Sequence, residues 1–161
     1  MATPALARTV RLSVGGSDDL DGVMRVMESA FGETYGEAWT RSQCAGILPM
    51  AGVSLIVARD EESQKTVGFS LFRNVAEDAE LLLLAVRADR HREGIGSLLL
   101  EDFLDRARSK GAARVHLEVR DGNPAVAMYS ACGFSPVGHR RNYYHAPDGR
   151  RFDAITLARS A

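Results

Sequence analysis

Cysteine is scarce in this chain, which argues against a fold held together by disulfides. The 161 residues contain two cysteines, Cys44 and Cys132, which form no CxxC pair and show no Cys/His ligand spacing. Isolated cysteines of this kind typically behave as small apolar side chains, and in the cytoplasm they stay reduced. The four histidines are scattered at spacings that match no metal-binding pattern. We therefore expect no metal site.

Long apolar runs and an excess of positive charge are missing as well. No window approaches the ~18 uninterrupted apolar residues of a membrane helix. Residues 1–8 lack the apolar segment of a secretion signal, so we expect a loose N-terminal end there. A net charge of -1 leaves no surplus of cations to displace counterions from phosphates. These absences predict a cytoplasmic protein whose partners are neither membranes nor nucleic acids.

The composition that remains is typical of one soluble globular domain. Hydrophobic residues make up 45% of the chain and charged residues 25%. The length suits one sizeable core, and the sequence contains no internal repeat, linker or low-complexity segment. We expect a single domain over residues 1–161.

The first third of the chain predicts a strand, two helices and a loop. Residues 9–14 alternate as a strand does, and apolar side chains recur at helical spacing over residues 17–32. A short second helix is expected over residues 40–48. Between the helices, residues 32–39 mix glycine, acidic and aromatic residues, as loops that form substrate walls often do.

The rest of the chain predicts a mixed sheet flanked by helices, an α/β (or α+β) fold. Strands over 53–58, 66–72 and 81–86 are expected to form an antiparallel meander. The third is continuously apolar, which indicates a central strand covered on both faces. A β-α-β-α order follows and predicts parallel pairing. The later elements are expected at 94–110 (helix), 114–119 (strand), 124–132 (helix), 136–144 (strand) and 152–157 (strand).

The segment LAVRADRHREGIGSLLL, residues 84–100, carries the clearest chemical signal. A buried strand runs through a basic loop into Gly94-Ile95-Gly96 at a helix start. Glycines let a phosphate approach the backbone, and the free N–H groups of the first helical turn favour negative charge. The spacing matches neither the Walker A loop nor the dinucleotide GxGxxG pattern. An ordinary tight turn is the alternative interpretation.

Further motifs lie within about forty residues of this loop. They are Leu117-Glu118-Val119-Arg120, Asn123, Met128-Tyr129 and Cys132-Gly133-Phe134. Together with the glycine loop, they resemble the GNAT acetyltransferases over nearly the whole chain. The resemblance implies a mixed, partly splayed central sheet flanked by helices, and acetyl-CoA as the cosubstrate.

A narrower resemblance comes from the C-terminal run Arg140-Arg141-Asn142-Tyr143-Tyr144, followed by Asp148-Gly149-Arg150 and Asp153-Ala154. This ending is similar to that of the bacterial ribosomal-protein-alanine N-acetyltransferases. The resemblance implies that the acceptor is the N-terminal alanine of a small-subunit ribosomal protein.

The resemblance also implies roles for individual residues. Glu118 matches the family's catalytic base and Tyr129 its general acid. The matched cofactor-binding positions are Leu84, Ala85 and Val86 for the pantetheine arm, Arg92, Glu93, Gly94, Ile95, Gly96 and Ser97 for the pyrophosphate, and Asn123 for a further contact. Two departures stand out: His91 replaces the usual Arg or Gln, and Asn123 and Tyr129 are six rather than seven residues apart.

The chemistry of amide formation fits these roles. An α-amino group titrates near ~8, so a carboxylate such as Glu118 is basic enough to help deprotonate it. A phenol such as Tyr129 can protonate a departing thiolate. A backbone N–H near Val86 can stabilise the oxyanion. The alternative interpretations are a solvated carboxylate at a strand end and a packed aromatic ring.

An acidic and aromatic groove for the acceptor is expected from the first loop and the C-terminal run. Its candidate residues are Glu33, Tyr35, Glu37, Trp39, Tyr143 and Tyr144. Arg140 and Arg141 are either surface charges or partners of the CoA phosphates. Two other functions stay open: acetylation of a free small amine, and a non-catalytic acyl-CoA-binding module.

Overall fold

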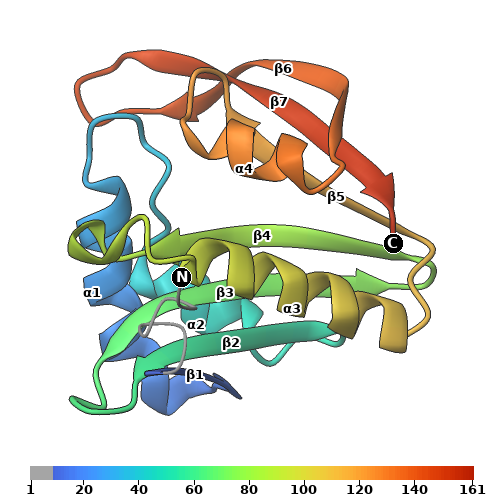
Figure 1. Cartoon of the computed structure of the whole chain (residues 1–161). Coiled ribbons are helices and arrows are strands. Elements are labelled where there is room, and N and C mark those ends of the chain that lie inside the picture. The colour runs from blue at the N-terminus through green and yellow to red at the C-terminus, as the bar shows by residue number, and fades with distance from the viewer. Residues whose placement is uncertain (1–8) are drawn as a thin grey trace.

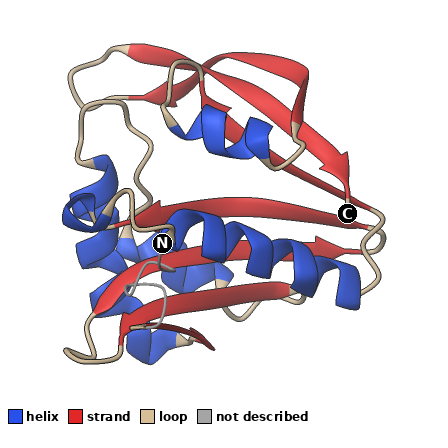
Figure 2. Cartoon of the chain, viewed as in Figure 1, coloured by secondary structure: helices blue, strands red, loops and turns tan. Residues whose placement is uncertain are grey.

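The computed structural model describes residues 9–161, and residues 1–8, expected as a loose end, lie outside the described part. The described chain forms a seven-stranded mixed sheet with helices on both faces (Figure 1, Figure 2). The strands are β1 (Val10–Val14), β2 (Val53–Asp60), β3 (Thr66–Val75), β4 (Asp78–Val86), β5 (Arg114–Arg120), β6 (Ser135–His145) and β7 (Arg151–Ser160). The helices are α1 (Leu20–Phe31), α2 (Arg41–Ile47), α3 (Ile95–Ser109) and α4 (Ala125–Ala131).

The predicted antiparallel meander is confirmed. The sheet order is β1-β2-β3-β4-β5-β7-β6, which places β4 at the centre. β2, β3 and β4 pair antiparallel along most of their length, and β1 adds an antiparallel edge. β3 and β4 are longer than the apolar segments that predicted them. β3 ends at Val75 and β4 starts at Asp78, so residues 76 and 77 alone form the turn.

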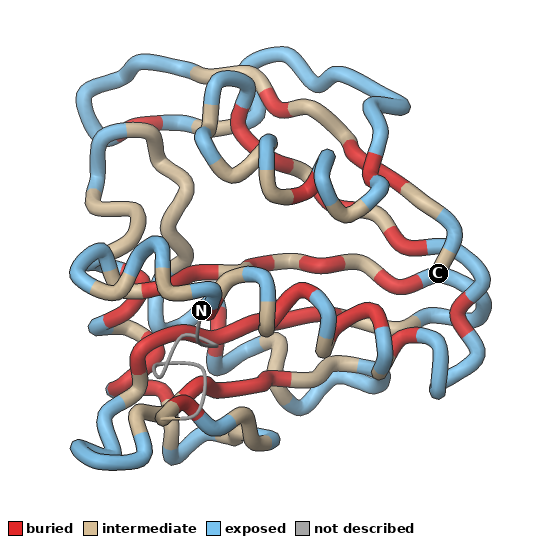
Figure 3. The backbone as a smooth tube through the Cα atoms, viewed as in Figure 1, coloured by how far each residue is buried: buried red, intermediate tan, exposed pale blue. Residues whose placement is uncertain are grey.

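Two apolar layers hold the helices against the sheet. Val23, Met27 and Phe69 belong to the layer that joins α1 and α2 to one face. Leu99, Phe103 and Leu117 belong to the layer that joins α3 to the opposite face. The burial view shows β2, β3 and β4 as largely buried and β6 as largely exposed (Figure 3).

The strand-helix-strand unit β4-α3-β5 is parallel, as predicted. The pairing covers four residue pairs, from Asp78↔Arg114 to Leu81↔Leu117, and stops there. β5 then continues in contact with β7, while the rest of β4 stays paired with β3. The sheet is therefore splayed between β4 and β5, as the resemblance implied.

The C-terminal strands form an antiparallel hairpin on the far side of the splay. β7 lies between β5 and β6, and the predicted turn at residues 147–149 joins β6 to β7. The register shifts between Arg140 and Tyr144, where Asn142 has a φ of +53°. This irregularity interrupts the regular β6–β7 pairing. No helix within residues 9–161 is long and apolar enough to cross a membrane.

Candidate active site

A cleft of about 750 Å³ opens where β4 and β5 separate. Both strands line it, and the start of α3, helix α4, the loop after α1 and the β6 irregularity close it. It gathers most of the residues singled out in the sequence: Tyr35, Trp39, Leu84, Ala85, Val86, Arg92, Gly94, Ile95, Gly96, Ser97, Glu118, Asn123, Tyr129, Tyr143 and Tyr144. Glu33 and Glu93 are not among the lining residues.

The glycine loop leaves open space at the N-terminus of α3. Gly94 is the N-cap in a left-handed conformation, with φ +82°, and no other part of the described chain comes within 4 Å of a Cβ at this position. The N–H groups of Ile95, Gly96 and Ser97 have no partner inside the helix, because the first helical turn lacks preceding carbonyls. A Cβ on Gly96 would stand 3.2 Å from the Met128 sulfur, so this glycine lets α3 approach α4.

Strand β4 contributes an open backbone edge. Beyond Leu81 its β5 side is unpaired, whereas its β3 side stays paired up to Val86. Backbone N–H and C=O groups along residues 82–86 can therefore bind an extended ligand that carries amides. His91, the departure from the family pattern, donates from Nε2 to the Val86 carbonyl oxygen at 3.0 Å. Its ring thereby ties the loop to the strand end.

Glu118 is a nearly buried carboxylate with two protein partners. Its side chain is 10% exposed. The Thr156 hydroxyl donates to its Oε2 at 2.5 Å, and Arg140 Nε lies 3.2 Å from its Oε1. Thr156 faces Glu118 across the β5–β7 pairing, and Arg140 lies at the register shift in β6. Arg140 was expected to be either a surface charge or a partner of the CoA phosphates, so its contact with Glu118 was not predicted.

Tyr129 is buried on α4. Its ring packs edge-on against Phe134 with 5.9 Å between the centroids. Burial raises the pKa of its phenol above the ordinary value, because the charged phenolate would lose its hydration. The hydroxyl therefore keeps its proton across the physiological range.

The two C-terminal tyrosines lie beside Glu118. The Tyr144 hydroxyl donates to the Glu118 carbonyl oxygen at 3.4 Å, and the Tyr143 ring packs edge-on against that of Tyr144. Burial, together with the negative charge of Glu118, raises the pKa of Tyr143. This end of the cleft is thus aromatic and adjoins the candidate base.

A buried ion pair that sequence reasoning did not identify holds the first loop in place. Arg120 Nε lies 3.4 Å from Glu37 Oε2, and the Arg120 guanidinium stacks 3.5 Å from the centre of the Tyr35 ring. Asn123 Nδ2 donates to Glu37 Oε2 at 2.8 Å, while Asn123 Oδ1 accepts from the Ala125 N–H. Asn123 therefore binds the first N–H group of α4 and anchors the loop. The only sequence signal that could have indicated this ion pair was Arg120, the arginine of the motif Leu117-Glu118-Val119-Arg120.

No group of three or more His, Cys, Asp or Glu residues within 9–161 is arranged to hold a metal ion.

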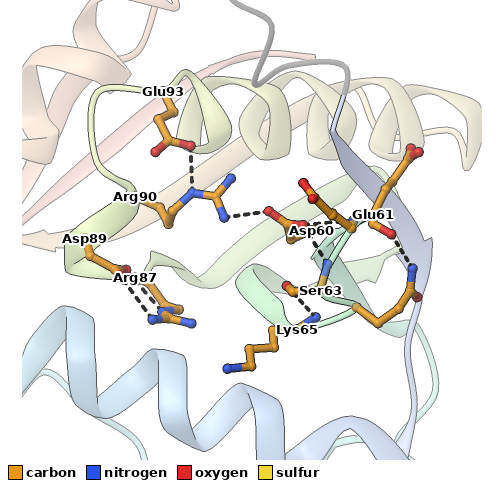
Figure 4. Close-up of polar contacts among 10 residues, drawn as sticks. Asp60, Glu61, Ser63, Lys65, Arg87, Asp89, Arg90 and Glu93 are labelled. Atoms are coloured by element: carbon orange, nitrogen blue, oxygen red, sulfur yellow. Dashed lines mark hydrogen bonds and ion pairs between the residues drawn. The ribbon is translucent and has the colours of Figure 1, made fainter.

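Glu93 and Arg90 form a separate charged network beside the glycine loop (Figure 4). Arg90 Nε donates to Glu93 Oε1 at 2.7 Å, and Arg90 Nη1 donates to Asp60 Oδ2 at 3.0 Å. The loop is thereby attached to the turn between β2 and β3.

Comparison with known proteins gives a consistent picture. The sequence profile of the acetyltransferase (GNAT) family matches residues 20–134. Over 98 residues the chain is 40% identical to the ribosomal protein bS18-alanine N-acetyltransferase of Escherichia coli K12, a stretch that is 60% of this chain and 66% of that relative.

Solved structures agree along nearly the whole chain. The crystal structure of the ribosomal-protein-S18-alanine N-acetyltransferase from Escherichia coli superposes with a TM-score of 0.82 at 30% identity, covering 94% of this chain and 93% of that one. Ard1 from Thermoplasma volcanium superposes with a TM-score of 0.82 at 26% identity, covering 95% and 98%.

Proposed function

Because this chain belongs to the acetyltransferase (GNAT) family, whose members use acetyl-CoA, we propose that it acetylates the α-amino group of a protein N-terminal alanine. The acceptor we propose is a small-subunit ribosomal protein, and the site of action is the cytoplasm, where such proteins are made. One observation carries the proposal: a carboxylate and a buried phenol face one cleft, whose other end is a glycine-capped helix N-terminus. The names of the similar E. coli proteins support this acceptor.

The donor fits the open edge of β4 and the start of α3. The amides of a pantetheine arm can pair with the backbone of Leu84, Ala85 and Val86, at the edge that β5 leaves unpaired. The pyrophosphate then reaches the free N–H groups of Ile95, Gly96 and Ser97, where the helix dipole favours negative charge. Arg92, exposed in the same loop, adds a cation near the phosphates.

Glu118 acts as the base. An α-amino group with a pKa near ~8 is mostly protonated at neutral pH, and only its unprotonated form attacks a thioester. Glu118 accepts this proton directly or through a water molecule. The hydrogen bond from Thr156 holds the carboxylate toward the cleft.

Tyr129 acts as the acid. The nitrogen forms a bond to the acetyl carbonyl carbon and loses its second proton to solvent, which returns a proton to Tyr129 after each turnover; the carbon–sulfur bond breaks, and the thiolate leaves with its electron pair. The Tyr129 hydroxyl, which burial keeps protonated, donates to that sulfur. The backbone N–H at the end of β4, near Val86, stabilises the tetrahedral oxyanion.

The acceptor peptide enters between the first loop and the C-terminal tyrosines. Tyr35, Trp39, Tyr143 and Tyr144 all line the cleft. Rigid aromatic walls orient an extended peptide with little loss of side-chain entropy. The α-amino group then points toward Glu118.

The test is thiol release from acetyl-CoA with a peptide that begins Ala-Arg-Tyr. The same peptide blocked at its N-terminus and a panel of small amines serve as controls. We expect thiol release with the free peptide alone. Release only with small amines would contradict the proposed acceptor, and an absence of release together with acetyl-CoA binding would indicate a non-catalytic acyl-CoA-binding protein.

A further inference from the structure

A negative charge stands next to the proposed phosphate site. Glu93 directly precedes Gly94, the N-cap of α3, and its side chain is only 16% exposed. An uncompensated carboxylate in this position would repel a pyrophosphate approaching the helix N-terminus, and poor solvent screening would strengthen the repulsion. The loop therefore needs a compensating charge.

Arg90 supplies this charge. Its guanidinium donates from Nε to Glu93 and from Nη1 to Asp60, and its side chain is also 16% exposed (Figure 4). The hydrogen bond to Glu93, followed by that to Asp60, raises the pKa of Arg90, while the Ser63 N–H and Arg90 lower the pKa of Asp60. Arg90 and Asp60 are therefore charged at neutral pH.

The neighbouring charged groups do not replace Arg90. Arg87, from the same loop, is engaged by Asp89 at 2.8 Å, and Arg92 is exposed. Buried ion pairs often add little net stability compared with apolar packing, so stability alone does not explain a charged side chain here. The Nη2 atom of Arg90 is also buried without a hydrogen-bond partner in residues 9–161. A buried donor without a partner costs stability, so stability does not explain this arginine either.

We propose that Arg90 is a positioning residue for the donor: it offsets the charge of Glu93, so that the helix N-terminus accepts the CoA pyrophosphate. This inference rests on the proposed use of acetyl-CoA. Removing the Arg90 charge leaves Glu93 free to repel the phosphates, whereas removing the Arg90 and Glu93 charges together returns the network to its original net charge, with only Asp60 left charged.

The experiment measures CoA affinity by isothermal titration calorimetry on the full chain. Arg90→Met is expected to weaken CoA binding roughly tenfold at low salt, and the deficit should shrink at high salt because ions screen the repulsion. Arg90→Met/Glu93→Gln should bind CoA within about twofold of the wild type. Arg106→Met, which removes an arginine paired with Asp102 further along α3, is the matched control and should bind normally.

Glu93→Gln alone keeps the test informative if Arg90→Met fails to fold. With Arg90 left partly unpaired beside the phosphates, this variant is expected to bind CoA severalfold more tightly. A loss of affinity in Arg90→Met that Glu93→Gln does not rescue, or an unchanged affinity in Glu93→Gln, would overturn the inference. Absence of CoA binding by the wild type would overturn the proposed function itself and the inference with it.

Discussion

Glu118 combines two contacts that hold it in a defined position without removing it from the cleft. Thr156 donates to one carboxylate oxygen and Arg140 approaches the other. The Arg140 side chain is 60% exposed, so solvent weakens this ion pair, and an incoming ammonium group can replace it. Glu118 is therefore oriented by a neutral hydroxyl and remains available to the acceptor.

Glu118→Gln is expected to lower kcat by about 10²-fold to 10⁴-fold, because a glutamine cannot accept the ammonium proton. The loss should be largest at low pH, where unprotonated amine is scarcest, and should diminish toward pH ~8. Rates measured across this pH range, with Thr156→Val as a variant that removes the hydrogen bond to Glu118 but keeps its carboxylate, test the expectation. A pH profile identical to that of the wild type would remove Glu118 as the base.

Tyr129→Phe keeps the ring packing against Phe134 and removes the hydroxyl. We expect turnover to fall by about 10²-fold or more, with CoA affinity within about twofold of the wild type. Steady-state kinetics together with calorimetric titration of CoA separate the two effects. If turnover is unchanged, Tyr129 is a packing residue and another group protonates the thiolate.

At the scale of secondary-structure elements, the site depends on the separation of β4 from β5 and on the N-terminus of α3. β4 and β5 pair through Leu81↔Leu117 and then separate, which leaves the β4 edge unpaired and the cleft open. Helix α3 begins at this edge with Gly94 in a left-handed conformation. The proposed catalytic groups from β5 and α4 and the proposed donor-binding groups from β4 and α3 therefore line the same cleft.

Gly94→Ala tests the helix end. A Cβ in this left-handed conformation costs about 1–2 kcal/mol of stability and projects into the space proposed for the phosphates. Gly149→Ala is a close control, because Gly149 has a φ of +89° in the β6–β7 turn and also faces open space. Both variants should unfold earlier in denaturant, but only Gly94→Ala should bind CoA more weakly. Equal CoA affinities would argue against phosphate binding at α3.

For the molecule as a whole, the two parts of the sheet are joined by a short parallel pairing and by the helices and loops around the cleft. The Glu37–Arg120 pair adds a buried link from the first loop to the end of β5. A ligand that fills the cleft contacts both parts and binds only the folded chain. Donor binding should therefore stabilise the entire fold.

CoA at 100 times its Kd is expected to add about 2.7 kcal/mol to the free energy of unfolding, which corresponds to a rise in Tm of roughly 5–10 °C for a chain of this size. Thermal unfolding followed by circular dichroism measures the shift. Tyr129→Phe should show the same shift as the wild type, since its donor site is intact. No shift at saturating CoA would contradict a donor site in the cleft.

The element order was predictable because it depends on local periodicity. The apolar run at residues 81–86 indicated a central strand, and the helix that follows it indicated the parallel partner; both are confirmed. The segment at residues 17–19 was less well predicted. It was assigned to the start of the first helix but forms a separate 3-10 turn, in which Asp19 accepts from the Gly16 N–H and pairs with Arg59 of β2.

The sequence by itself determined the family and the parts of the site that are contiguous along the chain. Gly94 and Gly96 at a helix start, and Glu118 and Tyr129 within short motifs that match the family, are local patterns that need no knowledge of pairing. The tertiary structure alone decided which side chains meet: Thr156 and Arg140 at Glu118, Glu37 at Arg120, and Asp60 at Arg90. These contacts depend on sheet order, register and the point where β4 and β5 separate, which are set by packing between residues distant in the chain.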